Sequence, residues 1–395
     1  MTTPFARRMH RVQPSAIREL LQLGDNPKVI SFGGGYPDST LFPYEELCAA
    51  AQTALVEDGA AALQYTASNG TPQLRAQIAA RMTSQGTLCH ADDVLILHGG
   101  QQGLDLVAKL FINPGDVIIT ENPTFLGALI AFNPYEPKYV GIGMDGDGMD
   151  MNQLEQALRD TPNVKMIYTV PDFHNPTGVT MSLARRHELI ALANRFHVMV
   201  LEDTPYREIR FAGESLPTLK SLDTEGRVIY LGTFSKILAP ALRIGWTVAA
   251  PAITHQLGLL KLAADTQCST LNMKIISLFL EQNDIEAHIA QLRDAYRRKC
   301  NVMLRTMAES FPETVTWTSP NGGLFTWLTF PEGFDAADFM RNQLLPHANV
   351  AFVPGAPFFP VHPVINHARV NYSSQSDSRI VQGIQAMGAL LKNPR

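Results

Sequence analysis

The chain has 395 residues, more than the roughly 250–300 at which a single hydrophobic core stops growing, so two domains are expected. Hydrophobic residues make up 45% of the sequence and charged residues 17%, and the formal net charge is -5. This slightly acidic globular composition gives no electrostatic basis for nucleic acid or an anionic membrane as a partner, whereas a small anionic ligand needs only local positive charge.

The N-terminal segment contains arginine and histidine but no continuous apolar stretch, so no secretory signal is predicted. The sequence also has no apolar run of about 18 residues, so we expect no membrane span and a cytoplasmic location. The cysteines Cys48, Cys89, Cys268 and Cys300 form no metal-type pair; we expect buried thiols in a reducing compartment and no metal site.

Short apolar runs rich in valine and isoleucine alternate with longer helical patterns as far as about residue 285. Such alternation predicts an α/β fold with a mostly parallel sheet and helices on both faces, in which ligands bind beyond the carboxyl ends of the strands. The expected strands are residues 94–98, 117–120, 165–170, 197–201, 228–232 and 244–249, and the clearest helices are 101–111 and 183–196.

The pattern changes after residue 285, where residues 285–310 predict one long amphipathic helix. A turn at 319–323, a strand at 324–330, a helix from Ala336 and a last helix from about Ser376 follow. We therefore expect a large domain at 44–285 and a smaller α+β domain at 286–395, against which residues 1–43 pack.

Three of the expected strands end in glycines or polar residues. The first is followed by Gly99 and Gly100 at a helix start, where free backbone N–H groups bind phosphate, although a Gly-Gly turn is often purely structural. The third leads into Asn175-Pro-Thr-Gly178, a turn by its own chemistry that also suits an ordinary loop. The fourth ends in Glu202 and Asp203; a carboxylate buried there needs a ligand cation, a helix cap or a salt bridge.

Lys236 follows the fifth expected strand among apolar neighbours. Most lysines are solvated surface residues, but one in this setting is expected to be partly buried, which lowers its pKa and makes its amine a usable nucleophile. Arg243 and the hydroxyls of Thr233 and Ser235 suit a phosphate.

Taken together, these segments supply a phosphate cradle, an amine able to form a Schiff base and a carboxylate for a ring nitrogen, with Asn175 and Tyr206 for a phenolate oxygen. These groups are what pyridoxal 5′-phosphate (PLP) requires of a protein. Their order along the chain is much more specific than any single segment.

In these segments the sequence resembles the fold-type I PLP-dependent aminotransferases of class I/II. The likeness is strongest to the branch of 2-aminoadipate, kynurenine and aromatic aminotransferases, and to the aminotransferase-like half of certain regulators. It implies a three-layer α/β fold with a mostly parallel seven-stranded sheet, PLP as the cofactor, and a homodimer with shared active sites. The likeness extends from Ile17 to the last helix and rests on residues 30–37, 63–66, 99–102, 121–125, 175–178, 203–206, 235–236 and 352–355, with Arg243 and Arg369.

The resemblance implies a role for each matching residue. Lys236 would hold the cofactor as a Schiff base and move protons, Asp203 would pair with the pyridine nitrogen, and Tyr206, the third catalytic residue, would hydrogen-bond the phenolate oxygen together with Asn175. The other implied cofactor contacts are Gly100, Gln101, Thr233, Ser235 and Arg243 at the phosphate, Phe125 on the ring face, and Tyr65 at the phosphate of the neighbouring subunit.

The resemblance also implies a substrate site. Arg369 would grip the α-carboxylate with help from Asn175, unless it is a surface residue on an edge strand. Gly35, Tyr36 and Arg18 would lie near the substrate side chain, where Arg18 either binds a distal carboxylate or packs at the domain junction. The aromatic residues that favour aromatic or other large hydrophobic substrates, unless they belong to the core, are Tyr36, Phe125, Phe358 and Phe359.

Two positions depart from the family pattern. Gly100 stands where serine is common, so one hydroxyl contact to the phosphate is lost, and Phe125 stands where tyrosine is common. We expect neither change to abolish PLP binding.

The expected reaction moves the amino group of an L-amino acid, aromatic or otherwise large and hydrophobic, or 2-aminoadipate, to a 2-oxo acid such as 2-oxoglutarate by a ping-pong mechanism. The same cofactor also serves C–S lyases, decarboxylases and racemases, because the reaction depends on which Cα bond stands perpendicular to the ring. A regulator's ligand-sensing domain is less favoured because the motif at Ile30 lies near the N-terminus. Retention of Lys236 with Asp203 argues against a catalytically silent protein.

Overall fold

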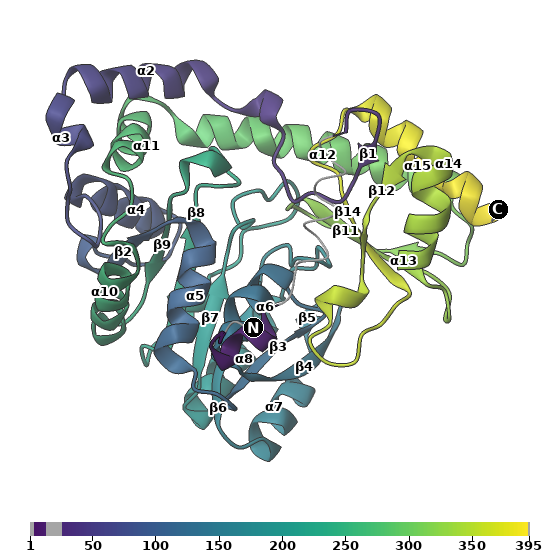
Figure 1. Cartoon of the computed structure of the whole chain (residues 1–395), viewed down its shortest axis with the longest axis horizontal. Helices are drawn as coiled ribbons and strands as arrows, with labels where there is room; N and C mark the ends of the chain where they lie inside the picture. The colour runs from purple at the N-terminus through teal and green to yellow at the C-terminus, as the bar shows by residue number, and fades with distance from the viewer. Residues whose placement is uncertain (1–3, 13–25, 394–395) are drawn as a thin grey trace.

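The computed structural model describes residues 4–12 and 26–393, and its largest element is an eight-stranded sheet with the order β2-β9-β8-β7-β6-β3-β4-β5 (Figure 1). The neighbours from β8 to β4 are parallel, β9 is antiparallel to β2 and β8, and β5 is antiparallel to β4. The strands are β2 (Val94–Leu97), β3 (Val117–Asn122), β4 (Lys138–Asp145), β5 (Gly148–Met149), β6 (Val164–Thr169), β7 (Met199–Asp203), β8 (Val228–Thr233) and β9 (Gly245–Val248).

This architecture confirms the mostly parallel α/β sheet. All six strands expected from apolar runs are present, and their ends differ from the expected ones by at most two residues. The sheet has eight strands and not the seven that the resemblance implies. The additional strand, β5, has two residues and returns beside β4 after a tight turn in which the Asp145 carboxylate accepts the Asp147 N–H.

The sheet is buried on both faces because alternate strand residues enter two different apolar cores. Ile118 and Met166 belong to the larger core, which also takes residues of α5 (Gly99–Phe111) and α6 (Leu126–Phe132). Ile119 and Ile167 belong to the second core, beneath α7 (Met151–Asp160) and α8 (Leu183–Phe196). The result is the expected arrangement of three layers.

A second, smaller sheet is antiparallel and has the order β10-β11-β14-β13. Figure 1 shows it to the right of the large sheet, with the long helix α12 running along the top to reach it. β1 and β12 form a separate parallel pair. The bounds are β1 (Ile30–Ser31), β10 (Thr316–Trp317), β11 (Phe325–Thr329), β12 (Val350–Ala351), β13 (Val353–Pro354) and β14 (His367–Asn371).

The long helix predicted after residue 285 is α12 (Ile285–Ser310). It begins there because the Asp284 carboxylate accepts the free N–H groups of Glu286 and Ala287, at 2.9 and 3.1 Å. The last helix, α15 (Asp377–Lys392), is capped by the Ser376 hydroxyl and packs against α12. The remaining helices are α2 (Tyr44–Val56), α3 (Gly59–Leu63), α4 (Pro72–Ser84), α9 (Leu219–Leu222), α10 (Pro251–Asp265), α11 (Thr270–Gln282), α13 (Ala336–Asp338) and α14 (Leu345–Ala348), with a π-helical turn at Phe339–Leu344.

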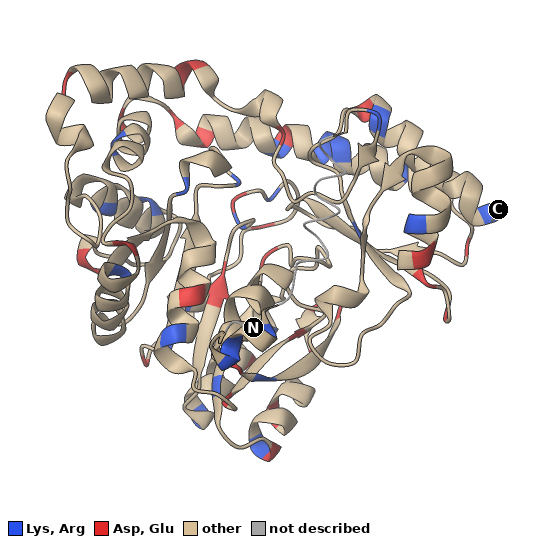
Figure 2. Cartoon of the chain, in the orientation of Figure 1, with Lys and Arg blue, Asp and Glu red and all other residues tan. Residues whose placement is uncertain are grey.

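The charges are dispersed over the described part of the chain, and Figure 2 shows lysine and arginine interspersed with aspartate and glutamate on both halves of the molecule. Within residues 4–12 and 26–393, no helix has the length and apolarity that crossing a membrane requires. The division into domains at residue 285 stays a prediction.

Candidate active site

A cavity of about 400 Å³ lies at the carboxyl ends of the parallel strands. Asp203 is the last residue of β7, Thr233 is the last residue of β8, and Asn175 follows β6. This is the edge at which α/β sheets bind ligands. Of the residues predicted for the site, those that line the cavity are Gly35, Tyr36, Gly100, Gln101, Phe125, Asn175, Asp203, Tyr206, Thr233, Ser235, Lys236, Arg243 and Arg369.

Lys236 lies in the turn after β8, and its Nζ donates a 2.8 Å hydrogen bond to the Gly35 carbonyl oxygen. Burial lowers the pKa of Lys236 to about 8, and the positive charges of Arg369 and Arg243 add to this effect. The amine is therefore neutral, and able to act as a nucleophile, in a much larger fraction of molecules than a solvated lysine would be.

Asp203 is 5% exposed and accepts a 2.9 Å hydrogen bond from the Tyr168 hydroxyl. Burial raises the pKa of Asp203 to about 7, against the opposite effect of the Tyr168 hydrogen bond. No lysine or arginine of the described segments forms an ion pair with this carboxyl. A carboxylate in this position is suited to a cationic group of a ligand.

One end of the cavity is built to hold an anion. Gly99 has φ +70°, which lets α5 start immediately after β2, and Gly100 and Gln101 of its first turn face the cavity. Arg243 is held by the carbonyl oxygens of Pro240 and His98, at 3.2 and 3.1 Å. Ser235 adds its hydroxyl, and the Thr233 hydroxyl donates to it at 2.9 Å.

At the opposite side, Arg369 lies on β14 and is 3% exposed. Its Nη1 donates to Asn175 Oδ1 at 2.9 Å and its Nη2 to the Gly33 carbonyl at 2.7 Å, while its buried Nε has no partner. The Asn175 amide in turn donates to the Tyr206 hydroxyl at 3.1 Å. Because β14 lies between β11 and β13, the alternative of a surface arginine on an edge strand is wrong.

The sequence model of the class I and II aminotransferases matches residues 27–386. The chain belongs to this family. It is 38% identical to aromatic-amino-acid aminotransferase 1 of Thermococcus litoralis over 98% of this chain and 94% of that one. Its structure matches a kynurenine aminotransferase of Pyrococcus horikoshii with a TM-score of 0.94 and 37% identity, over 98% of this chain and 96% of that one.

A third comparison is with the α-aminoadipate aminotransferase of Thermus thermophilus, whose crystal structure holds a phosphopyridoxyl-leucine complex. The TM-score is 0.91 and the identity 35%, over 98% of this chain and 97% of that one. These findings confirm a PLP-dependent aminotransferase that acts on amino acids and 2-oxo acids.

The cavity of the aminotransferase fits PLP on its own chemistry. Arg243, Ser235 and the start of α5 form an anion site, Lys236 supplies an amine, and the unpaired Asp203 suits a protonated ring nitrogen. The unpartnered Arg369 Nε suits the carboxylate of an amino acid. An ideal Cβ at Gly100 meets only Leu231, at 3.9 Å, so the space for the family's usual serine is present.

Three of the predicted residues that the structure describes do not line this cavity, and a further one, Arg18, lies outside the described residues. Tyr65 is 80% exposed. Phe358 and Phe359 are buried in a small core with Trp327, and Phe358 is 5.2 Å from the Arg369 guanidinium. For these two phenylalanines, the core alternative holds.

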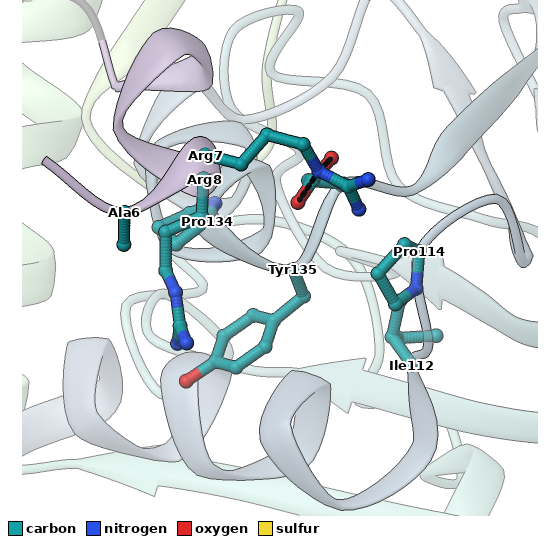
Figure 3. Close-up of a pocket in the computed structure, with 8 residues that line it drawn as sticks. Ala6, Arg7, Arg8, Ile112, Pro114, Pro134 and Tyr135 are labelled. Atoms are coloured by element: carbon teal, nitrogen blue, oxygen red, sulfur yellow. Dashed lines mark hydrogen bonds and ion pairs between the residues drawn. The ribbon is translucent and has the colours of Figure 1, made fainter. Parts of the chain in front are cut away.

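A second cavity, of about 480 Å³, has different chemistry. It lies where residues 6–8 pack against Ile112, Pro114 and Tyr135, and Figure 3 shows the Arg7 side chain extending across it. Arg7 forms an ion pair with Glu136, which also lines this cavity. The two atoms of this pair are 3.1 Å apart. Of the residues predicted for cofactor and substrate, none that the structure describes lines this cavity.

The prediction from sequence missed the apolar wall of the active site. Apolar side chains on α5 and α6 have no chemistry of their own, although their helical spacing after Gly100 and Phe125 could have indicated them. The missed lining residues are Leu104, Leu126, Gly127, Ile130, Pro205 and Pro240.

Proposed function

We propose that this aminotransferase takes the amino group from an L-amino acid with an aromatic or other large hydrophobic side chain, or from 2-aminoadipate, and passes it to a 2-oxo acid such as 2-oxoglutarate in a ping-pong reaction. The names of its relatives support these substrates. The apolar wall of Leu104, Leu126 and Ile130 supports a hydrophobic side chain. A distal carboxylate would depend on Arg18.

We propose the residue roles that the resemblance implies. Lys236 is the attachment point, Asp203 pairs with the ring nitrogen, and Asn175 and Tyr206 hydrogen-bond the phenolate oxygen. The phosphate contacts are Gly100, Gln101, Thr233, Ser235 and Arg243, the ring contact is Phe125, and the substrate contacts are Arg369, Asn175, Gly35, Tyr36 and Arg18. The observation that carries these roles is that one cavity unites Lys236, Asp203, Arg243 and Arg369.

In the proposed reaction, Arg369 and Asn175 orient the substrate carboxylate, and Lys236 Nζ removes the proton from the substrate Cα. The bound cofactor supplies a conjugated ring that accepts the electrons left at Cα. Asp203 keeps a proton on the ring nitrogen by electrostatic attraction. Burial raises the pKa of Tyr206 to about 12, so its hydroxyl remains a hydrogen-bond donor throughout.

We also propose a cytoplasmic homodimer with shared active sites. Tyr65 is exposed on its own chain, which suits a contact with a neighbouring subunit. Cys89, Cys268 and Cys300 are free and buried, which suits a reducing compartment. Cys48 is free but exposed, so the expectation of a buried thiol is wrong at that position.

The test replaces Lys236 by alanine and measures amino-acid turnover. We expect a loss of about 10³-fold or more, because the proton-transfer group is removed, with the fold retained. Near-normal turnover would overturn the assignment. Asp203→Ala is expected to bind PLP weakly and to slow the half-reaction with an amino acid; a normal half-reaction would remove the role given to Asp203.

A further inference from the structure

A second carboxyl group is buried behind Asp203. Glu121 is near the end of β3, which neighbours β6, and its side chain is 1% exposed. Its Oε1 accepts the Val170 N–H at 3.1 Å and the Thr169 hydroxyl. Its Oε2 has no partner among the described residues. The proposed role of Asp203 gives Glu121 no function.

A ring nitrogen of His174 lies close to this oxygen and also lacks a hydrogen-bond partner among the described residues. His174 precedes Asn175 and is 1% exposed, and its Nε2 has no hydrogen-bond partner in the described chain. The two orphan atoms are 3.8 Å apart, too far for a hydrogen bond and too close for a water between them. A hydrogen bond between them requires that the carboxyl group or the ring shifts to close this gap, and that one of the two atoms carries a proton.

The charges around Glu121 determine whether its own oxygen or the His174 nitrogen carries the proton. The titratable groups that face it are Tyr168 from β6, Asp203 from β7 and His174 from the following loop. None of them supplies a positive charge, because burial lowers the pKa of His174 to about 3. Two carboxylates that interact in a buried compartment cannot both stay ionised without a cation. A protonated ring nitrogen would neutralise Asp203 and leave Glu121 uncompensated.

We propose that Glu121 remains a neutral carboxylic acid whose proton points from Oε2 to His174 Nε2, so that Glu121 acts as a positioning residue for Asp203 and Asn175. This inference rests on the role proposed for Asp203. If Glu121 is neutral, Asp203 is the single negatively charged residue of this carboxyl pair, and its charge is available to the ring nitrogen of the cofactor. The hydrogen bond also holds His174 in the tautomer whose Nδ1–H donates to the Thr177 hydroxyl at 2.8 Å, and not in the one whose Nδ1 accepts the Thr177 N–H at the longer distance of 3.4 Å. These contacts lie within the turn that presents Asn175.

The first test is infrared difference spectroscopy of the holoenzyme against Glu121→Gln. We expect the difference to contain the C=O stretch of a protonated carboxylic acid, which lies above both carboxylate stretches in frequency. His174→Ala should move this band further up, because the acid loses its acceptor. The matched control is Glu188→Gln on the exposed side of α8, which should remove carboxylate bands alone. Carboxylate bands in the Glu121 difference would overturn the proposal.

The second test is the pH dependence of the cofactor's visible absorption. Glu121→Ala is expected to shift its midpoint and raise KM for amino acids. Glu121→Gln is expected to restore both, because a neutral amide can still accept from Val170 and Thr169 and donate to His174. A midpoint that Glu121→Gln moves by about one pH unit or more would show an ionised Glu121 and contradict the proposal. The failure of Asp203 in its proposed role would be seen separately, as a normal half-reaction in Asp203→Ala.

Discussion

At the scale of single residues, the chemistry depends on where positive charge is placed. Lys236 shares its cavity with Arg243 and Arg369, and both guanidiniums disfavour a charged amine at Lys236. Burial has the same effect and is the larger cause. The lysine is thus prepared for covalent chemistry before any ligand arrives.

This arrangement predicts how cofactor uptake depends on pH. The pKa of Lys236 falls from 10.5 to about 8, so the neutral amine is the minor form below pH 8 and the major form above it. We expect the rate at which apoprotein takes up PLP to rise through pH 8 and then level off, measured by stopped-flow absorbance. N-acetyl-lysine amide, as a control, should keep rising to higher pH. A protein rate that follows the control would contradict the expected burial.

Arg369 gives a second prediction at this scale. Its fork contacts Asn175 and Gly33, and a lysine cannot reproduce two parallel donors. We expect Arg369→Lys to raise KM for amino acids about 10–100-fold with a smaller change in kcat. Steady-state kinetics test this, with Arg341→Lys on the exposed surface as control. An unchanged KM would show that Arg369 does not bind the carboxylate.

Single residues also show where sequence reasoning ends. Lys236 and Asp203 could be predicted because Asp203 ends one apolar strand and Lys236 follows another within three residues, at the edge where sheet geometry gathers ligand contacts. The pairing of Glu121 with His174 could not be predicted, because nothing along the chain shows that β3 neighbours β6 or that these two side chains face each other. Phe358 looked like a pocket residue because composition cannot tell a cavity wall from a core.

At the scale of elements, the start of α5 controls the phosphate end of the cavity. Gly99 has φ +70°, and a Cβ there would lie 2.5 Å from Arg243 Nη2. Gly115 has φ +90° and no atom within 4 Å of its Cβ position. Replacing either glycine by alanine would therefore strain the backbone, but only the substitution at Gly99 would also bring a methyl group against Arg243.

We expect Gly99→Ala to weaken PLP binding about tenfold or more, because it displaces the guanidinium that is to hold the phosphate. Gly115→Ala should lower the melting temperature by a similar amount and leave PLP affinity unchanged. Fluorescence titration of the apoproteins measures both affinities. Equal affinities in the two variants would mean that Arg243 is not a phosphate ligand.

Element boundaries were predictable where local chemistry sets them. The limits of α8 and α12 were predicted to the residue, because an N-cap or a left-handed residue such as His197 marks the end of a periodic pattern. The two-residue strands β1, β5, β10, β12 and β13 were not predicted, and neither was the eight-residue strand β4. The two-residue strands have no period of their own and exist only through their partners.

At the scale of the whole molecule, Tyr65 is the residue proposed to contact a second chain. It is 80% exposed and does not line its own cavity. If Tyr65 contributes to the site of the neighbouring subunit, the Lys236→Ala and Tyr65→Ala variants should each have low activity alone. Activity should return when the two variants are mixed, unfolded and refolded together. A mixed dimer then has one site with both native residues. No recovery, with mixed dimers present on native mass spectrometry, would place Tyr65 outside the partner's site.

The central claim is that Lys236 forms the covalent bond to PLP. Borohydride reduction of the purified holoenzyme followed by peptide mass spectrometry tests it most directly. We expect a phosphopyridoxyl adduct on the peptide that contains Lys236, with loss of the visible absorption. An adduct on another lysine, or none in protein that has been supplied with PLP, would contradict the account.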